Sequence, residues 1–204
     1  MITIEHPMFL FGLVAGLIYL LTVIVGGELR PGYTIYQAIS ELTLPASPNR
    51  TKISVSFILF NILLLIYGVI FGVTFSFNFW LLLSALTYVV VALAGFGMIR
   101  YPMDPLHSKD TKRGTRHNNL ATVAIVGSII IVISGTFGFY QVLALRPLAL
   151  TSLVMSTLVA LSALGAWISA LRKSLAFGSF QKASLGLFMI WLGWSSVALS
   201  TIAF

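Results

Sequence analysis

The most informative stretch of this chain is residues 53–99, in which two long apolar runs are separated by three residues. The first run, residues 53–75, reads ISVSFILFNILLLIYGVIFGVTF, and the second, residues 79–99, reads FWLLLSALTYVVVALAGFGMI. Each run has the length of roughly 20 apolar residues that a helix needs to cross a bilayer, and neither contains Asp, Glu, Lys, Arg or His. A connection of three residues joins antiparallel neighbours. The stretch therefore predicts a transmembrane helical hairpin.

Four further apolar runs of similar length repeat this pattern along the chain. The six expected spans cover residues 9–27, 53–75, 79–99, 120–140, 148–171 and 183–204. Of the 204 residues, 58% are hydrophobic and 8% are charged, whereas a soluble domain carries roughly 25% charged residues. The sequence therefore predicts an all-α integral membrane protein with one domain, residues 1–204, built as a bundle of six transmembrane helices. The remaining residues are too few for an additional soluble domain.

The basic residues lie almost entirely in alternate loops. Eleven of the twelve occur in segments 28–52, 100–119 and 172–182, and Arg146 alone lies on the other side. Because loops rich in Lys and Arg remain in the cytoplasm, we expect these three segments to be cytoplasmic. Two of them are long, the outer turns are short, and both termini are expected outside, in the cell (plasma) membrane. Topology explains the basic excess, so no nucleic acid partner is expected.

Two absences from the sequence exclude several classes of function. The chain contains no cysteine, which excludes disulfides, thiolate nucleophiles, iron–sulfur clusters and Cys-ligated zinc. The expected spans carry no ionisable side chain, and such side chains mark proton relays and ion pathways. Proton pumping and charge-coupled antiport are therefore not expected. The neutral polar residues of the spans predict hydrogen bonds between helices; they are Asn61, Thr87, Ser128, Ser134, Ser156 and Ser195.

The first long loop predicts a short amphipathic helix over residues 34–44, which lies at the interface or folds onto the bundle. Its expected apolar face is Ile35, Ile39 and Leu42, and its expected polar face is Thr34, Gln37 and Glu41. Ser47 and Pro48 then have the residue types that begin a helix. Glu41 is one of only five acidic residues. A salt bridge to a nearby Arg or Lys is its simplest role, and participation in a site is the alternative.

The second long loop carries an aspartate and a histidine at adjacent helix ends. Asp104 follows a span, where the helix dipole disfavours an anion, so it needs a compensating partner. His117 precedes the next span, where the positive end of the helix favours a neutral imidazole. The two could form an orienting pair for catalysis or, with Glu41 or His107, an O/N zinc site; a charge-paired structural loop is the plainer alternative. The spacing matches no recognised metal signature, so a metal stays open and no cofactor is evident.

Short motifs in both loops resemble a known family. They are Pro31-Gly32-Tyr33, Ala38-Ile39-Ser40-Glu41-Leu42, Ser47-Pro48-Asn49, Tyr101-Pro102-Met103-Asp104 and Gly114-Thr115-Arg116-His117. Together they are similar to the bacterial and archaeal domain of unknown function 998 family, with Tyr101 where that family usually has Phe. The resemblance implies a multi-pass membrane protein of unsettled function. A more distant likeness to the eukaryotic Frag/DRAM/Sfk group, which has an Ile-Ser-Asp element in its first loop, would give Glu41 the acidic position and implies lipid remodelling or organisation.

These features lead to one principal hypothesis, a polar site at the cytoplasmic rim that binds or processes the headgroup of a lipid or other amphiphile. Its expected core is Asp104, His117 and Glu41. If the protein is an enzyme, it would be a lipid hydrolase or transferase in which His117 is the base or a ligand and Asp104 orients it. Contacts with the headgroup, anionic lipids in particular, are expected from Ser40, Asn49, His107, Lys109, Lys112, Arg113 and Arg116.

An alternative of a different class is a non-catalytic subunit or scaffold of a larger membrane complex. Trp167, Trp191 and Trp194 would then anchor in lipid or pack against a partner protein. Transport of an uncharged solute is a third possibility. It is less favoured because all seven prolines lie at span ends or in loops, so no span is interrupted by proline near its middle.

Overall fold

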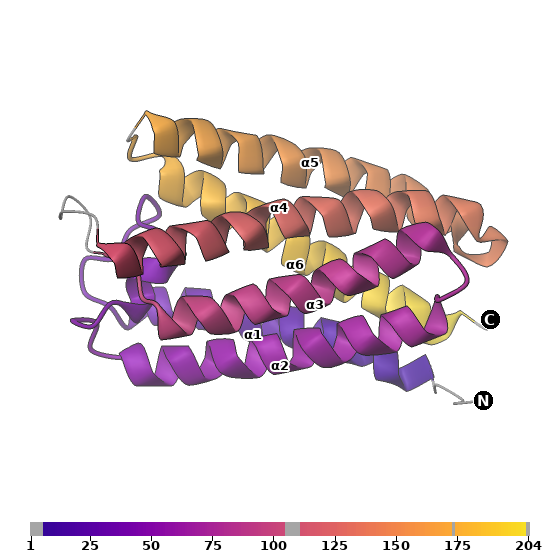
Figure 1. Ribbon diagram of the computed structural model, residues 1–204, viewed down its shortest axis with the longest axis horizontal. Helices are drawn as coiled ribbons and strands as arrows, with labels where there is room; N and C mark the ends of the chain where they lie inside the picture. The colour runs from indigo at the N-terminus through magenta and orange to yellow at the C-terminus, as the bar shows by residue number, and fades with distance from the viewer. Residues whose placement is uncertain (1–5, 105–110, 173, 203–204) are drawn as a thin grey trace.

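The computed structural model describes residues 6–104, 111–172 and 174–202 (Figure 1). Its long helices are α1 (Leu10–Glu28), α2 (Arg50–Thr74), α3 (Phe79–Arg100), α4 (Lys112–Gln141), α5 (Arg146–Leu171) and α6 (Phe177–Thr201). Short 3-10 turns are η1 (His6–Phe9), η2 (Ile39–Thr43) and η3 (Leu143–Leu145). All six helices are long and apolar enough to cross a membrane. The chain is a multi-pass membrane protein with the all-α, six-helix architecture expected from its sequence.

Consecutive helices run antiparallel and pack against each other, and α1 also packs against α6 (Figure 1). α6 is the most enclosed helix, since 50% of its most apolar window is buried, compared with 28% for α1. Trp191 on α6 is 1% exposed, stacks on Phe188 and donates its indole N–H to Ser152 Oγ at 2.9 Å. The expectation that Trp191 anchors in lipid or contacts a partner is therefore wrong. Trp167 and Trp194 are 64% and 37% exposed.

Local capping sets where the helices begin. The Asn78 side chain accepts the Leu81 amide at the start of α3, and the Thr111 hydroxyl accepts the Gly114 amide at the start of α4. Because Thr111 caps it, α4 begins well before residue 120, the expected start of that span. His117 consequently lies on the second turn of α4, close to the helix entry where the sequence placed it.

Ser47 does not cap α2 as expected. The helix begins at Arg50, after Asn49, and Asn49 makes no side-chain capping bond. The buried Ser47 hydroxyl has no hydrogen-bond partner within the part of the chain that the structure describes.

The helix expected over residues 34–44 forms only as the short turn η2. In a helix over these residues the Ile39 amide would pair with the Ile35 carbonyl four residues earlier. Instead, Gln181 on α6 accepts the Ile39 amide at 3.0 Å, and Lys182 on α6 donates to the Ile35 carbonyl. Contacts with α6 thus replace this helical hydrogen bond.

The same segment folds onto the end of the bundle, which was one of the two expected positions. Ile39 and Leu42 are 5% and 0% exposed, as the apolar face requires. The other two assignments are wrong, because Ile35 is 61% exposed and Glu41 is 5% exposed. The Glu41 carboxylate tolerates burial because it is paired with other groups of the loop.

The connections α1–α2, α3–α4 and α5–α6 gather at one end of the bundle, which we call the loop end (Figure 1). α1 begins and α6 ends at the opposite end, where the short connections α2–α3 and α4–α5 also lie. Arg146 lies at that opposite end, whereas the other basic residues of the described helices lie at or near the loop end. The uneven distribution of basic residues among the loops thus corresponds to a difference in charge between the two ends of the bundle. A cytoplasmic loop end remains an expectation from the positive-inside rule.

Candidate functional site

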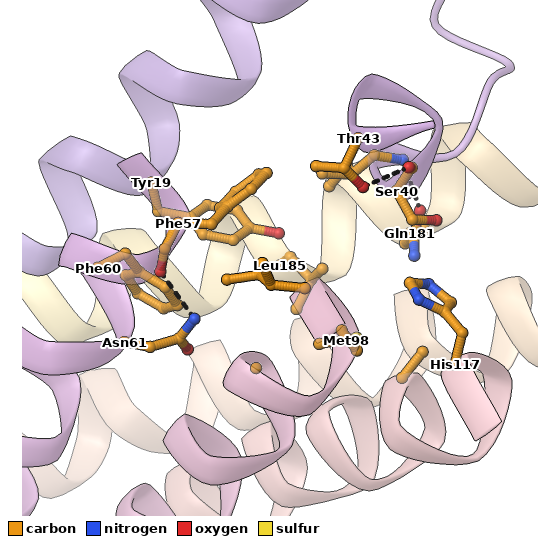
Figure 2. A pocket seen from close by; sticks show the side chains of 14 residues that line it. Tyr19, Ser40, Thr43, Phe57, Phe60, Asn61, Met98, His117, Gln181 and Leu185 are labelled. Atoms are coloured by element: carbon orange, nitrogen blue, oxygen red, sulfur yellow. Dashed lines mark hydrogen bonds between the residues drawn. The ribbon is translucent and has the colours of Figure 1, made fainter. Parts of the chain in front are cut away.

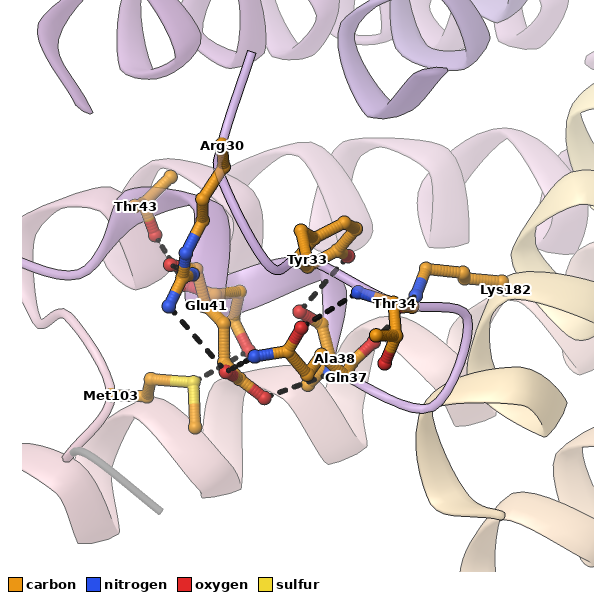
Figure 3. A network of polar contacts seen from close by, with 10 residues as sticks. Arg30, Tyr33, Thr34, Gln37, Ala38, Glu41, Thr43, Met103 and Lys182 are labelled. Carbon is orange, nitrogen blue, oxygen red and sulfur yellow. Dashed lines mark hydrogen bonds and ion pairs between the residues drawn. The ribbon is translucent and has the colours of Figure 1, made fainter. Parts of the chain in front are cut away.

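Glu41 lies inside a network of polar contacts within the first loop (Figure 3). Its carboxylate accepts hydrogen bonds from the Ala38 amide and the Gln37 side chain, both at 3.1 Å. It also forms an ion pair with Arg30 at 3.7 Å, and the Arg30 guanidinium donates to the Glu41 carbonyl. The expected salt bridge of Glu41 is confirmed, and these contacts stabilise the fold of the loop.

Lys182, near the start of α6, fastens the first loop to the bundle (Figure 3). Its ammonium donates to the carbonyls of Thr34 and Ile35, at 3.0 Å each, and of Gln37, at 2.6 Å. The same ammonium lies 4.4 Å from the centre of the Tyr33 ring, a distance at which a cation is attracted to the ring face. In the sequence Lys182 is one of the basic residues that indicate topology, and no local pattern marks this anchoring role.

Asp104 closes the first turn of α4. Its carboxylate accepts the Thr111 amide at 2.7 Å and the Thr111 hydroxyl at 2.8 Å, and Arg113 lies 3.7 Å away. The hydrogen bonds from Thr111, together with the charge of Arg113, lower the pKa of Asp104 below its usual value. A Cβ atom at Gly114 would overlap this carboxylate, so glycine permits the close approach. The compensating partner expected for Asp104 is present.

His117 is held by the backbone of the segment that follows α3. The side chain is buried, and its Nδ1 atom lies 2.8 Å from the Tyr101 carbonyl oxygen. A carbonyl only accepts hydrogen bonds, so Nδ1 carries the hydrogen and Nε2 of the neutral ring keeps a lone pair. Among the described contacts, no ion pair or hydrogen bond joins His117 to Asp104. The carbonyl of Tyr101 therefore orients the imidazole.

A cavity of about 100 Å³ lies beneath η2 at the loop end (Figure 2). Its polar lining comes from Ser40, Thr43, Asn61, His117 and Gln181, and its larger apolar lining includes Tyr19, Phe57, Phe60, Met98 and Leu185. Figure 2 shows Ser40, Gln181 and His117 on one side of the cavity and Phe57 and Phe60 on the other. The cavity therefore combines a polar side with an aromatic side. Thr43, Asn61 and Gln181 were not among the expected site residues.

Of the residues expected to form the site, the structure brings His117 and Ser40 together. Glu41 and Asp104 do not line the cavity. The Asn49 side chain also lies outside it, and donates to the Leu29 carbonyl at 3.3 Å. The expected cluster is thus separated: His117 and Ser40 line the cavity, whereas Glu41 and Asp104 each stabilise their own loop.

The expected basic contacts lie on the surface of the loop end. Lys112 and Arg113 are exposed on the first turn of α4, and the Arg116 guanidinium lies over the Tyr101 ring, 5.2 Å from its centre. Two more expected contacts, His107 and Lys109, lie outside the described residues.

No cluster of three or more His, Asp or Glu side chains that could hold a metal occurs within residues 6–104, 111–172 and 174–202. An O/N zinc site that includes His107 stays a prediction.

Comparison with known proteins gives the family. A family model described as "Protein of unknown function (DUF998)" matches residues 13–198, most of the chain. The chain belongs to this family. No curated protein and no solved structure matches it. Membership of DUF998 confirms the resemblance that the loop motifs suggested.

In this DUF998 protein, the two motifs of the second loop meet in space. The carbonyl of Tyr101 contacts the His117 ring, and the carboxylate of Asp104 lies against Gly114. Residues 101–104 and 114–117 therefore form a clasp that joins the end of α3 to the start of α4. The clasp holds His117 at the wall of the cavity.

Proposed function

We propose that the cavity beneath η2 binds the polar headgroup of a lipid or another amphiphile. The lining carries the proposal, because His117, Gln181 and Ser40 lie on one side and aromatic rings on the other. Ligand sites typically combine an apolar wall with a few polar groups that orient the ligand. The position at the end of six apolar helices corresponds to the level at which headgroups meet hydrocarbon in a bilayer.

The exposed basic residues of the loop end support attraction to lipid without forming the cavity. Lys112 and Arg113 lie on the first turn of α4. A basic residue near an anionic membrane surface contributes about 1 kcal/mol to attraction. In the proposal these residues enrich anionic lipids around the protein, and the cavity supplies the specific contacts.

Binding is proposed rather than processing of the lipid. Hydrolysis or group transfer needs a nucleophile or an activated water beside a base. The described lining of the cavity includes no carboxylate to stabilise a protonated imidazole, and a backbone carbonyl holds the Nδ1 atom of His117 instead, so the expected Asp104–His117 catalytic pair gains no support. The alternative role as a subunit of a larger complex gains no specific support. The exposed apolar faces of α1 and α5 are already explained by contact with the lipid of the bilayer, so they do not indicate a partner protein.

Native mass spectrometry of protein released gently from its membrane tests the proposal. We expect a retained lipid mass in the wild type and in Tyr140→Phe, which removes one polar atom from a side chain at the opposite end. The His117→Phe variant keeps an aromatic ring but removes both nitrogens, and we expect it to lose that mass. If His117→Phe does not fold, Ser40→Ala removes a different polar group from the cavity. Wild-type protein released without lipid, or full lipid retention in folded His117→Phe, would contradict the proposal.

A further inference from the structure

A second, larger cavity is an apolar groove of about 650 Å³ on the side of the bundle. It lies between the loop-end halves of α4 and α5, with the start of α6 at its base. Figure 1 shows α5 diverging from α4 toward the loop end. Small side chains of α5 leave the space open; they are Ala160, Ala163, Ala166 and Ala170. Because these helices span the membrane, the groove faces the hydrocarbon of the bilayer.

The groove adjoins the cavity beneath η2, because Ala121 on α4 and Gln181 on α6 line both spaces. From the loop side, Ile39 and Thr43 of η2 cover the cavity, and Lys182 anchors the preceding segment. The boundary between the cavity and the groove is therefore formed in part by the small side chain of Ala121.

Gln181 presents a hydrogen-bond donor to this space. It is 6% exposed, and its side-chain oxygen accepts the Ile39 amide at 3.0 Å, which fixes the orientation of the amide group. The amide nitrogen points into the cavity toward His117 (Figure 2). A side-chain amide nitrogen only donates hydrogen bonds, so it can serve a ligand group that accepts one.

His117 presents an acceptor to the same space. Its Nδ1–H is used by the Tyr101 carbonyl, so the Nε2 lone pair is the one left for a ligand. A hydroxyl fits both contacts, because its oxygen can accept from Gln181 while its hydrogen is donated to His117.

We propose that the cavity and the groove together hold one uncharged lipid that ends in a hydroxyl group. The hydroxyl oxygen accepts from Gln181 and its hydrogen is donated to His117, while the hydrocarbon chain passes Ala121 and lies in the groove. A phosphate or carboxylate would be buried without a cation, because the described linings contain no Lys or Arg, and burying an unpaired charge is costly. This inference rests on the proposed function and specifies the class of lipid and its path.

Two probes that differ in one group test the proposal on the full chain. They are 1-oleoylglycerol and 1-oleoylglycerol 3-phosphate, which share the chain and the glycerol. We expect wild-type protein to bind the uncharged probe at least about tenfold more tightly, because the phosphate is not compensated. Ala121→Phe fills the junction and is expected to weaken that binding by about tenfold or more. Val123→Phe adds a ring to a side chain that is 41% exposed and lines neither space, and is expected to bind as wild type does.

Equal affinity for the two probes, or wild-type affinity in folded Ala121→Phe, would overturn the proposal. If Ala121→Phe does not fold, Ala160→Leu narrows the groove from α5 and is expected to weaken binding in its place. Crosslinking of a Trp167→Cys variant into dimers in the membrane would mean that a second copy covers the groove, which also overturns it. One combination of results would overturn this inference but not the proposed function. In it, native mass spectrometry shows a lipid that the wild type retains and His117→Phe loses, while the wild type binds the two probes with equal affinity. Absence of any bound lipid would overturn the proposed function as well.

Discussion

Replacing Lys182 by Met is expected to loosen the first loop from α6. The substitution keeps an unbranched side chain but removes the ammonium that donates to three carbonyls of the loop. Two of these contacts are exposed, so water replaces them at little cost. The third, to Gln37 at 2.6 Å, is partly buried.

The expected size of the effect follows from that one contact. A hydrogen bond to a charged group stabilises by about 1.5–3 kcal/mol. Lys182 is only half-buried, which places its bond at the lower end, roughly 1.5 kcal/mol. Since about 1.4 kcal/mol corresponds to a factor of ten, the fraction of molecules with an open loop should rise roughly tenfold.

Thiol labelling measures this opening directly, because the chain has no cysteine of its own. A Thr43→Cys reporter lies on η2, where the native side chain is 9% exposed, and it reacts with a maleimide when the loop opens. We expect labelling about ten times faster when Lys182→Met is added. The matched control is Lys52→Met, which removes a lysine from an exposed position of α2. An unchanged labelling rate in Lys182→Met, or an equal increase in Lys52→Met, would refute the reasoning.

Three further outcomes are expected. Gly178→Ala should accelerate labelling of the same reporter, because its Cβ would overlap loop carbonyls; Gly186→Ala, with open space around it, should not. The pKa of Asp104 is lowered, so its ionised carboxylate stabilises the start of α4 fully at pH values above the usual pKa of aspartate. This stabilisation is lost as the pH falls through the lowered pKa. The protection of that turn against hydrogen exchange, measured relative to the intrinsic exchange rate at each pH, should therefore fall in acid, and Asp104→Asn should abolish this fall. Ser152→Ala leaves the buried indole N–H of Trp191 without its acceptor, which should destabilise the bundle by about 1–3 kcal/mol and lower its Tm in detergent; an unchanged Tm would contradict this.

The number of spans could be predicted because the thickness of the bilayer sets how many apolar residues each span needs. The length of α4 could not, because a cap at Thr111 extends the helix beyond its apolar run. Neutral polar residues were less predictable. Ser134 bonds Ser84 on α3 at 2.6 Å, and Ser156 bonds Thr136 on α4 at 3.0 Å, as expected for contacts between helices. The others donate to carbonyls of their own helix; they are Asn61, Thr87, Ser128 and Ser195. A carbonyl three or four residues earlier is always within reach, whereas a partner on another helix depends on how the helices are rotated, which the spans alone do not specify.

The candidate site was predictable only in part for a related reason. Charged residues in the loops stand out in an apolar sequence, yet Glu41 and Asp104 use their charges within their own segments. The cavity draws on neutral groups instead, among them Gln181, which contacts Ile39 from 142 positions away in the chain. No local pattern marks such a pair. His117 was identified because its position at the start of a helix was already visible in the sequence.

One face of α6 contacts both the first loop, which covers the cavity, and the cavity itself. Gly178, Gln181 and Lys182 are spaced three and four residues apart, so they share a helical face, and each contacts the segment from Tyr36 to Ile39. Gln181 therefore faces the loop with its oxygen and the cavity with its nitrogen. A ligand that accepts from this nitrogen holds the amide in the orientation that also binds Ile39. Ligand binding and loop closure should then be coupled, and the coupling is reciprocal. 1-Oleoylglycerol should slow labelling of an Ala38→Cys reporter, whose native side chain is buried but does not line the cavity, and Lys182→Met should weaken binding of that lipid. Slower labelling without weaker binding, or the reverse, would show that the two are not linked through Gln181.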